Sequence, residues 1–200
     1  EKIAGTSPYQ SPTDMGVNMV GNCIVDDEVC QEASKAEIVR RWFRAAEKLE
    51  RTGMGESELT KINLLMKDVN VDQNFSPAHA ACLHKAEETG KLAGAMVMPD
   101  GSIITGKTSE LLGAPASLLL NALKYVVGIE KKTFIVSNEV LRPICALKEN
   151  NFKLAHTSLY ADEMLIALSI SSITNPLAGK AVDATQLLRG CDAYFSSIIP

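Results

Sequence analysis

Two short apolar runs separated by a turn mark the centre of the sequence. Ala93–Met98 and Ile103–Thr105 flank the tetrapeptide Pro99–Ser102, whose Asp-Gly pair is typical of a β-hairpin turn. A glycine-punctuated loop follows, and from about Pro115 the apolar residues recur at helical spacing. The pattern therefore predicts strand, turn, strand, loop and helix, which is half of an α/β layer.

The residues before this centre show mostly helical patterns. Apolar residues three and four positions apart predict a helix from Asp26 to about Arg51, a second over Leu59–Val69 and a third that starts after Ser76. Residues 1–22 instead carry the prolines and glycines of a loop. We therefore expect residues 1–90 to form a loop plus a helical arm, and residues 91–200 to form an α/β sandwich domain.

The last third of the chain alternates apolar runs with helical patterns. Lys132–Ser137 predicts a buried strand and Asn138–Glu149 a helix. Asp162–Ile173 is apolar on nearly every side, so we expect a deeply buried helix. Leu177–Leu188 predicts another helix and Ala193–Ile199 a final strand. The expected fold is α/β: a layered sandwich with a mixed sheet flanked by helices, plus the helical N-terminal arm.

Composition limits the classes of partner and the compartment. The net charge is -4 and aromatic residues make up 5% of the chain, so we expect neither nucleic acid nor a membrane as partner. The five cysteines are odd in number, widely spaced and without a C-x-x-C pair. This usage fits the reducing cytoplasm better than a disulfide framework or a zinc knuckle. The first residue is Glu1, and we expect the chain to be a piece of a longer protein.

The first candidate ligand site lies in the N-terminal loop. Thr13, Asp14, Asn18 and Asn22 stand among small and apolar residues there. A long loop rich in such side chains is typical of a ligand-binding loop. An equally weighted interpretation is a connector, in which the Asx side chains bond their own backbone.

A second candidate is the segment Gly101–Thr108, which matches the phosphate-loop pattern G-x-x-x-x-G-K-[ST]. In a true phosphate loop, backbone N–H groups wrap the phosphates at the start of a helix. Ile103 and Ile104 are β-branched and favour an extended backbone, and Gly113 and Pro115 interrupt the following helix. We therefore favour a hairpin here and keep a nucleotide-dependent transferase or hydrolase as an alternative.

The order of the elements is similar to that of the cytidine-deaminase-like sandwich. In zinc deaminases, H-x-E and P-C-x-x-C motifs at two helix starts supply the His and Cys ligands of the zinc and a catalytic Glu. This chain has Ala114-Pro115-Ala116 and Pro143-Ile144-Cys145-Ala146 at the corresponding places, so we predict a zinc-free relative without a metal site. Its pocket would bind a small ligand through four consecutive residues: Lys107, Thr108, Ser109 and Glu110.

The third candidate is the acidic pair Asp162 and Glu163, with His156 nearby in the sequence. Paired acids at the head of a buried helix can act as a general base or bind a cation. The interpretation that we favour is that they complement the positive end of the helix dipole. No catalytic residue and no cofactor can be assigned from these patterns.

Several longer stretches carry a resemblance to a known family. SPYQSPTDMGVNMVGNCIVDDEVCQEASKAEIVRR, PDGSIITGKTSELLGA, LLNALK and DEMLIALSISSITNP occur in the order typical of the bacterial uncharacterised family DUF1846 (UPF0371), which the chain resembles over nearly its whole length. Family members are longer, so the resemblance implies a C-terminal portion that follows a Rossmann-like domain. Some members have been labelled ATP-dependent peptidases, a label that this stretch does not support. The family usually has His-Thr before the acidic pair, where this chain has Tyr160 and Ala161.

These observations favour a binding role for the chain. We expect it to bind a small anionic or nucleotide-like metabolite where residues 13–22 meet residues 107–110, closed by an upstream domain of the same protein. The competing interpretations are the nucleotide-dependent enzyme and a structural domain that forms homo-oligomers.

Overall fold

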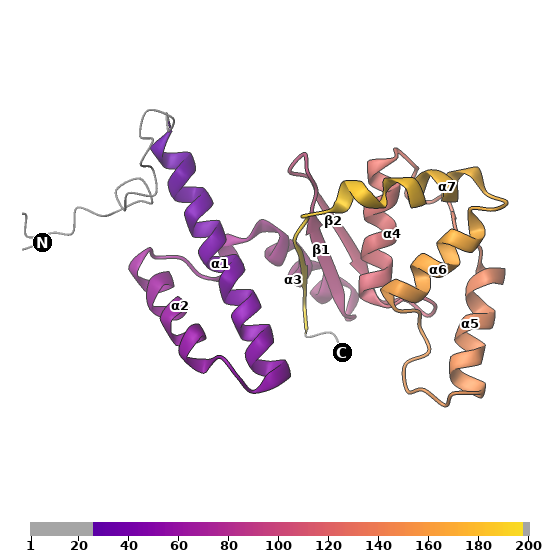
Figure 1. Ribbon diagram of the computed structural model, residues 1–200, viewed down its shortest axis with the longest axis horizontal. Coiled ribbons are helices and arrows are strands. Elements are labelled where there is room, and N and C mark those ends of the chain that lie inside the picture. Colours follow the sequence, from indigo (N-terminus) through magenta and orange to yellow (C-terminus); the bar gives the residue numbers. More distant parts are fainter. Residues whose placement is uncertain (1–25, 198–200) are drawn as a thin grey trace, which may run out of the picture. The chain divides into compact units, whose positions relative to one another are not determined.

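The N-terminal unit of the protein is a helical hairpin (Figure 1). The computed structural model describes residues 26–197, and the chain divides into two units between Ser76 and Pro77. Helix α1 (Asp27–Thr52) is followed by α2 (Glu56–Asp68) and a 3₁₀ turn, η2 (Gln73–Phe75). Both helices agree with the sequence prediction.

Local chemistry explains the ends of α1 and the packing of the hairpin. The Asp26 carboxylate accepts the N–H of Val29 at 3.1 Å and caps the start of α1. Gly53 ends the helix in the left-handed region, with φ 68°. The two helices share a small apolar core made of Val39, Ala45, Ile62 and Met66.

The second unit is built on a three-stranded antiparallel sheet. Strands β1 (Ala93–Val97), β2 (Ile103–Lys107) and β3 (Ala193–Phe195) lie in the order β2-β1-β3. The N–H of Met98 bonds to the carbonyl of Ser102, and Gly101 has φ 83° in the turn. The Asp-Gly hairpin is therefore confirmed.

Two helices cover the faces of this sheet (Figure 1). Helix α3 (Pro77–Thr89) packs its Cys82 against Ala95, whereas α4 (Ala114–Val126) packs its Leu118 against Met96. Neighbouring residues of β1 thus face opposite layers, as the two-residue period of a strand requires.

The remaining helices surround a larger core on the far side of α4. They are α5 (Asn138–Asn150), α6 (Ala161–Ser171), α7 (Pro176–Asp183) and the 3₁₀ turn η3 (Ala184–Leu188). Fully buried side chains in this core include Leu123, Leu159, Met164 and Leu168.

Three sequence expectations about this unit are wrong or unconfirmed. The sheet is antiparallel throughout the described residues rather than mixed, and its three strands do not confirm a deaminase-like sandwich. The segment Lys132–Ser137 is irregular rather than a strand. Its Ile135 and Val136 are buried in the helical core, so the apolar run that suggested a strand is explained by packing between helices.

Helix α6 is also less buried than its sequence suggests. Met164, Ala167 and Leu168 face the core, whereas Ile166, Ile170 and, just beyond the helix, Ile173 are exposed, the last by 81%. The helix lies at the surface of the unit, so only one face meets other elements. The expectation of burial on all sides is therefore wrong.

Candidate functional site

The phosphate-loop pattern lies on a hairpin. Lys107, Gly106 and Thr105 pair in register with Ala93, Gly94 and Ala95 of β1. Gly106, which would bend around the phosphate in a phosphate loop, is thus extended inside β2. Lys107, the lysine of the pattern, is the last residue of the strand. The segment forms no phosphate cradle, as the β-branched Ile103 and Ile104 indicated.

The predicted site residues fall in different parts of the chain. Thr13, Asp14, Asn18 and Asn22 lie outside the described residues and remain predictions. Lys107 is exposed at the end of β2; the pKa of Glu88 on α3 is lowered mainly by the hydrogen bond from Lys85, and the charge of Lys107 adds only a small part. Thr108 donates its backbone N–H to Leu92, which continues the strand pairing.

The other predicted residues lie around helix α5. The carboxylate of Glu110 lies 3.8 Å from the Arg142 guanidinium. The next residue, Leu111, accepts the N–H of Leu159 at 2.9 Å, which brings the loop after β2 beside the segment that enters α6. Ser109 turns this loop by accepting the N–H of Leu112 at 3.0 Å.

The acidic pair at the head of α6 has a structural explanation. Oε2 of Glu163 accepts the backbone N–H of Tyr160 at 2.8 Å, which caps the helix, and also the Lys148 ammonium at 2.7 Å. Lys148 is buried, donates to the Ser158 carbonyl at 2.8 Å and lies 4.1 Å from the Tyr160 ring centroid. Asp162 and His156 are exposed. The pair therefore completes a helix cap and an ion pair.

A cavity of about 260 Å³ lies between β2 and α4. Strand β2 contributes the free edge of the sheet, and α4 contributes a row of polar side chains. Asn121 donates its side-chain N–H to the Thr105 carbonyl at 2.9 Å and so joins the helix to the strand edge. The full lining is Ile103, Ile104, Thr105, Asn121, Lys124, Tyr125, Ile129 and Lys131.

Lys124 is the unusual residue of this cavity. It is only 7% exposed, and its Nζ donates to the Lys131 carbonyl at 3.0 Å. Within residues 26–197 it has no acidic partner. Burial, followed by the nearby charge of Lys131, holds the pKa of Lys124 below its usual value of 10.5.

Tyr125 anchors the mouth of the same cavity to the hairpin turn. Its hydroxyl donates to the Asp100 carboxylate at 2.6 Å and lies 2.8 Å from the Ser102 hydroxyl. The bond from Tyr125 is the main cause of a lowered pKa at Asp100. The hairpin turn is thus fixed to the helix that carries Lys124.

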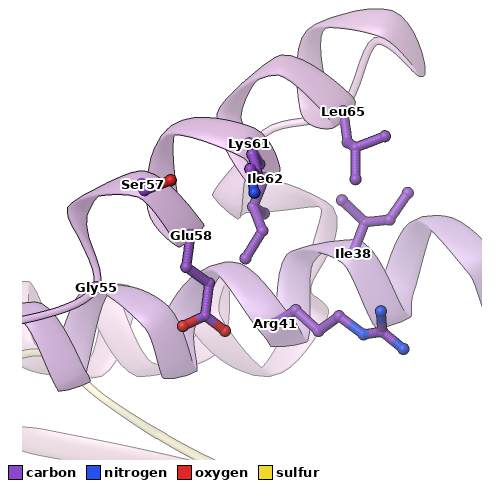
Figure 2. Close-up of a pocket in the computed structure, with 8 residues that line it drawn as sticks. All are labelled: Ile38, Arg41, Gly55, Ser57, Glu58, Lys61, Ile62 and Leu65. Carbon is purple, nitrogen blue, oxygen red and sulfur yellow. The ribbon is translucent and has the colours of Figure 1, made fainter.

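A second hollow lies within the helical hairpin (Figure 2). Ile38 of α1 faces Ile62 and Leu65 of α2, and charged side chains stand around these apolar residues. Glu58 is paired with Lys48, and Arg41 with Glu37. Because these two charged groups already have partners and no buried polar group faces the hollow, we give it less weight than the β2–α4 cavity.

The sequence does contain a signal for the β2–α4 cavity. Asn121, Lys124 and Tyr125 stand at positions i, i+3 and i+4 of a predicted helix whose other residues, apart from Ser117, are apolar. Such spacing places three polar side chains on one face, next to the hairpin that precedes the helix. The apolar stripe of this helix predicts its packing, and its polar stripe marks the cavity.

The described part of the chain lacks both a metal-binding cluster and a membrane-spanning helix. Residues 26–197 contain no group of three or more His, Cys, Asp and Glu side chains able to hold a metal ion. Within the same range, no helix has the length and apolarity needed to cross a membrane.

Comparisons with known proteins place the chain in a family. Residues 74–200 match the model described as domain of unknown function DUF1846, C-terminal, and residues 1–70 match the corresponding N-terminal model. The chain belongs to the DUF1846 (UPF0371) family. The resemblance seen in the sequence is therefore confirmed.

Relatives within the DUF1846 family match over the whole chain. The UPF0371 proteins of Corynebacterium aurimucosum and Corynebacterium efficiens are 44% and 43% identical to it over 199 residues. The UPF0371 protein of Streptococcus thermophilus is 42% identical over the same length. Each match covers all of this chain and 40% of the relative, so the chain spans less than half the length of these proteins.

Proposed function

We propose that the second unit binds a small anionic metabolite in the cavity between β2 and α4. The observation that carries the proposal is Lys124, a nearly buried ammonium whose hydrogen-bond partner is a backbone carbonyl. Removing such a charge from water is costly unless a counter-charge approaches it. A bound carboxylate or phosphate would supply that charge.

The surroundings of Lys124 support an anion of modest size. Lys131 adds a second positive charge at the exposed side of the cavity, and Asn121 adds an amide. The volume of about 260 Å³ lies below the usual range for drug-sized ligands, so the cavity fits a small acid or a phosphate ester better than a whole nucleotide. Ile103 and Ile129 contribute partly buried apolar side chains to the lining.

Binding and mutagenesis together test this proposal. The protein is screened by thermal shift against inorganic phosphate, sugar phosphates, small carboxylates, amino acids and nucleotides, and each hit is measured by calorimetry. We expect Lys124→Met to weaken the hit by about tenfold to hundredfold, because a charge-assisted hydrogen bond is lost. Lys180→Met, at an exposed position of α7, is the matched control and should bind normally. The proposal would be rejected if Lys124→Met bound the hit with the same affinity as the wild type, or if no compound bound at all.

The nucleotide-dependent alternative makes a separate prediction. If the hairpin rearranged to hold a triphosphate, ATP with magnesium would stabilise the wild type and fail to stabilise Lys107→Ala. The strand pairing of Gly106 and Lys107 supports the opposite outcome, with ATP having the same effect on both proteins.

A structural role is the second candidate function, and the exposed face of α6 favours it. Ile166, Ile170 and Ile173 form an exposed stripe, and residues 164–179 contain no charged side chain. An uncharged stripe can face its own copy across a two-fold axis without like-charge repulsion. We propose that a second copy of the chain covers this stripe. Ile170→Glu should convert a dimer to a monomer in light scattering, whereas a wild type that is already monomeric would reject this role.

We also propose a cytoplasmic location, with an upstream domain of the same protein as a further partner. The four described cysteines are all free thiols, as expected in a reducing compartment. The relatives are long enough to contain another domain, because this chain spans 40% of their length. Fractionation of the native protein and copurification of the two domains would test these assignments.

A further inference from the structure

We propose that Lys124 is an amine nucleophile that forms a Schiff base with a small carbonyl compound bearing an anionic group. This inference rests on the proposed binding of an anion in the β2–α4 cavity and names the ligand class more closely. It starts from the position of the amine in a cavity bounded by the strand edge, Asn121 and Lys131.

The hydrogen bonding of Lys124 suits a nucleophile. The Nζ has one protein partner within residues 26–197, the Lys131 carbonyl at 3.0 Å. A neutral amine donates an N–H to a carbonyl and keeps its lone pair for attack. A lysine held by a carboxylate would instead be fixed in its charged, unreactive form.

Lys148, in the same unit, is an example of a lysine held by a carboxylate. Both lysines are nearly buried, but Lys148 donates to the Glu163 carboxylate at 2.7 Å, whereas the partner of Lys124 is neutral. Burial and the charge of Lys131 lower the pKa of Lys124, which raises the fraction of free amine near neutral pH. Desolvation and a neighbouring cation are the two usual ways of activating a lysine nucleophile.

The reaction balances without a redox partner. The Nζ lone pair forms a bond to the carbonyl carbon while the C=O π electrons move to oxygen, and a proton passes from nitrogen to that oxygen. The resulting carbinolamine then loses its hydroxyl with a second proton as water, and the nitrogen lone pair forms the C=N bond. Aldehyde or ketone plus lysine gives imine plus water, and nothing is oxidised or reduced.

The cavity also selects the carbonyl compound. The protonated form of Lys124 and the exposed Lys131 both attract the carboxylate into the cavity, and the free-amine form of Lys124 then meets the adjacent carbonyl. The cavity of about 260 Å³ fits a short α-keto acid, in which the carboxylate and the carbonyl are adjacent. Pyruvate is therefore the probe that we choose.

Reductive trapping tests the inference directly. The protein is incubated with pyruvate and sodium cyanoborohydride near neutral pH, and peptides are mapped by mass spectrometry. We expect one secondary-amine adduct on Lys124, formed at least about tenfold faster than adducts on exposed lysines such as Lys180. Lys124→Met should abolish it, and Lys148→Met should leave it unchanged. Adducts spread evenly over exposed lysines, or no adduct at all, would overturn the inference.

Two further measurements separate this inference from the anion site itself. Lactate has the carboxylate of pyruvate without its carbonyl, so binding of lactate and pyruvate without trapping would reject the nucleophile and leave the anion site standing. If neither compound binds and none is trapped, the nucleophile is rejected, while the anion site stands or falls with the wider screen of phosphates, carboxylates and nucleotides. The rate of trapping should rise with pH towards a plateau below 10.5, and Lys131→Gln should move that rise to higher pH.

Discussion

The Nζ of Lys148 lies 2.7 Å from Oε2 of Glu163, although only 3% of the Lys148 side chain is exposed. The carboxylate also caps α6 through the Tyr160 N–H. We expect Glu163→Gln to lower the free energy of unfolding by about 2–4 kcal/mol, because it leaves a buried ammonium without its counter-charge. Urea denaturation followed by circular dichroism measures this change.

The neighbouring acid provides the control for this ion pair. Asp162→Asn changes an exposed carboxylate in the same helical turn and should cost less than about 0.5 kcal/mol. The double variant Lys148→Met/Glu163→Gln should be more stable than Glu163→Gln alone, because it removes the unpaired charge. Equal effects of Glu163→Gln and Asp162→Asn would show that the ion pair carries no stability.

Gly106 allows α4 to lie directly on β2. A Cβ at this position would overlap the backbone of Ser117 and Leu118. Because backbone atoms cannot move aside as a flexible side chain can, Gly106→Ala should destabilise the second unit by about 3 kcal/mol. Chemical denaturation measures the loss.

Gly101 is the matched position for this test. It has φ 83° with open space around it, so Gly101→Ala should cost only about 1–2 kcal/mol through backbone strain. If Gly101→Ala proved the more damaging of the two, the close packing of α4 on β2 would be refuted.

Lys124→Met should stabilise the protein by roughly 1–2 kcal/mol near neutral pH, because it removes a charge held away from water. The folded-state pKa of Lys124 lies below the unfolded value, so the unfolded chain binds more protons between them. The burial penalty is complete below the folded pKa and is relieved as the pH rises to 10.5. The advantage of the Met variant should therefore shrink with increasing pH.

Urea denaturation of both proteins at about pH 7 and about pH 10 measures that difference. Groups that titrate alike in the two proteins cancel when the two free energies are subtracted. An advantage that stayed constant would mean that the pKa of Lys124 is the same in the folded and unfolded chains, and one that grew with pH would mean that folding raises it; either result would contradict the burial penalty.

Cys82 should be the least reactive of the described thiols. Its side chain is fully buried and lies 3.2 Å from the Ala93 carbonyl, and burial raises its pKa to about 11. A thiol reacts as its thiolate, so we expect Cys82 to resist Ellman's reagent in the folded protein, whereas half-buried Cys30 and Cys191 react first. Peptide mapping after partial labelling identifies the order, and early labelling of Cys82 would contradict the packing of α3 on the sheet.

Local patterns predicted local elements well. The helix after Asp26 and the hairpin around Asp100 and Gly101 depend on residues close in sequence, and both are confirmed. Ile103 and Ile104 also act locally. Because they favour an extended backbone, they correctly predicted a strand instead of a phosphate loop. The strand predicted over residues 132–137 is wrong because an apolar run can pack between helices as well as in a sheet. Only the rest of the fold decides between these two environments.

The candidate site was harder to predict than the elements around it. Lys124 becomes unusual only when the chain from Gly128 to Lys131 folds back and offers a carbonyl to its Nζ. The environment of Glu163 likewise depends on Lys148, fifteen residues earlier. Charge environment is a property of the folded chain, so the residue types alone indicated several candidate sites and did not single out Lys124.

The pairing of β1 with β3 constrains how the protein can be made. Ala93 exchanges backbone and side-chain hydrogen bonds with Ser196, a residue 103 positions later. During synthesis, the middle strand therefore has one unpaired edge until residue 196 has left the ribosome. A premature stop after α7 would leave that edge permanently unpaired, and we expect such a product to aggregate while the helical hairpin of α1 and α2 still folds.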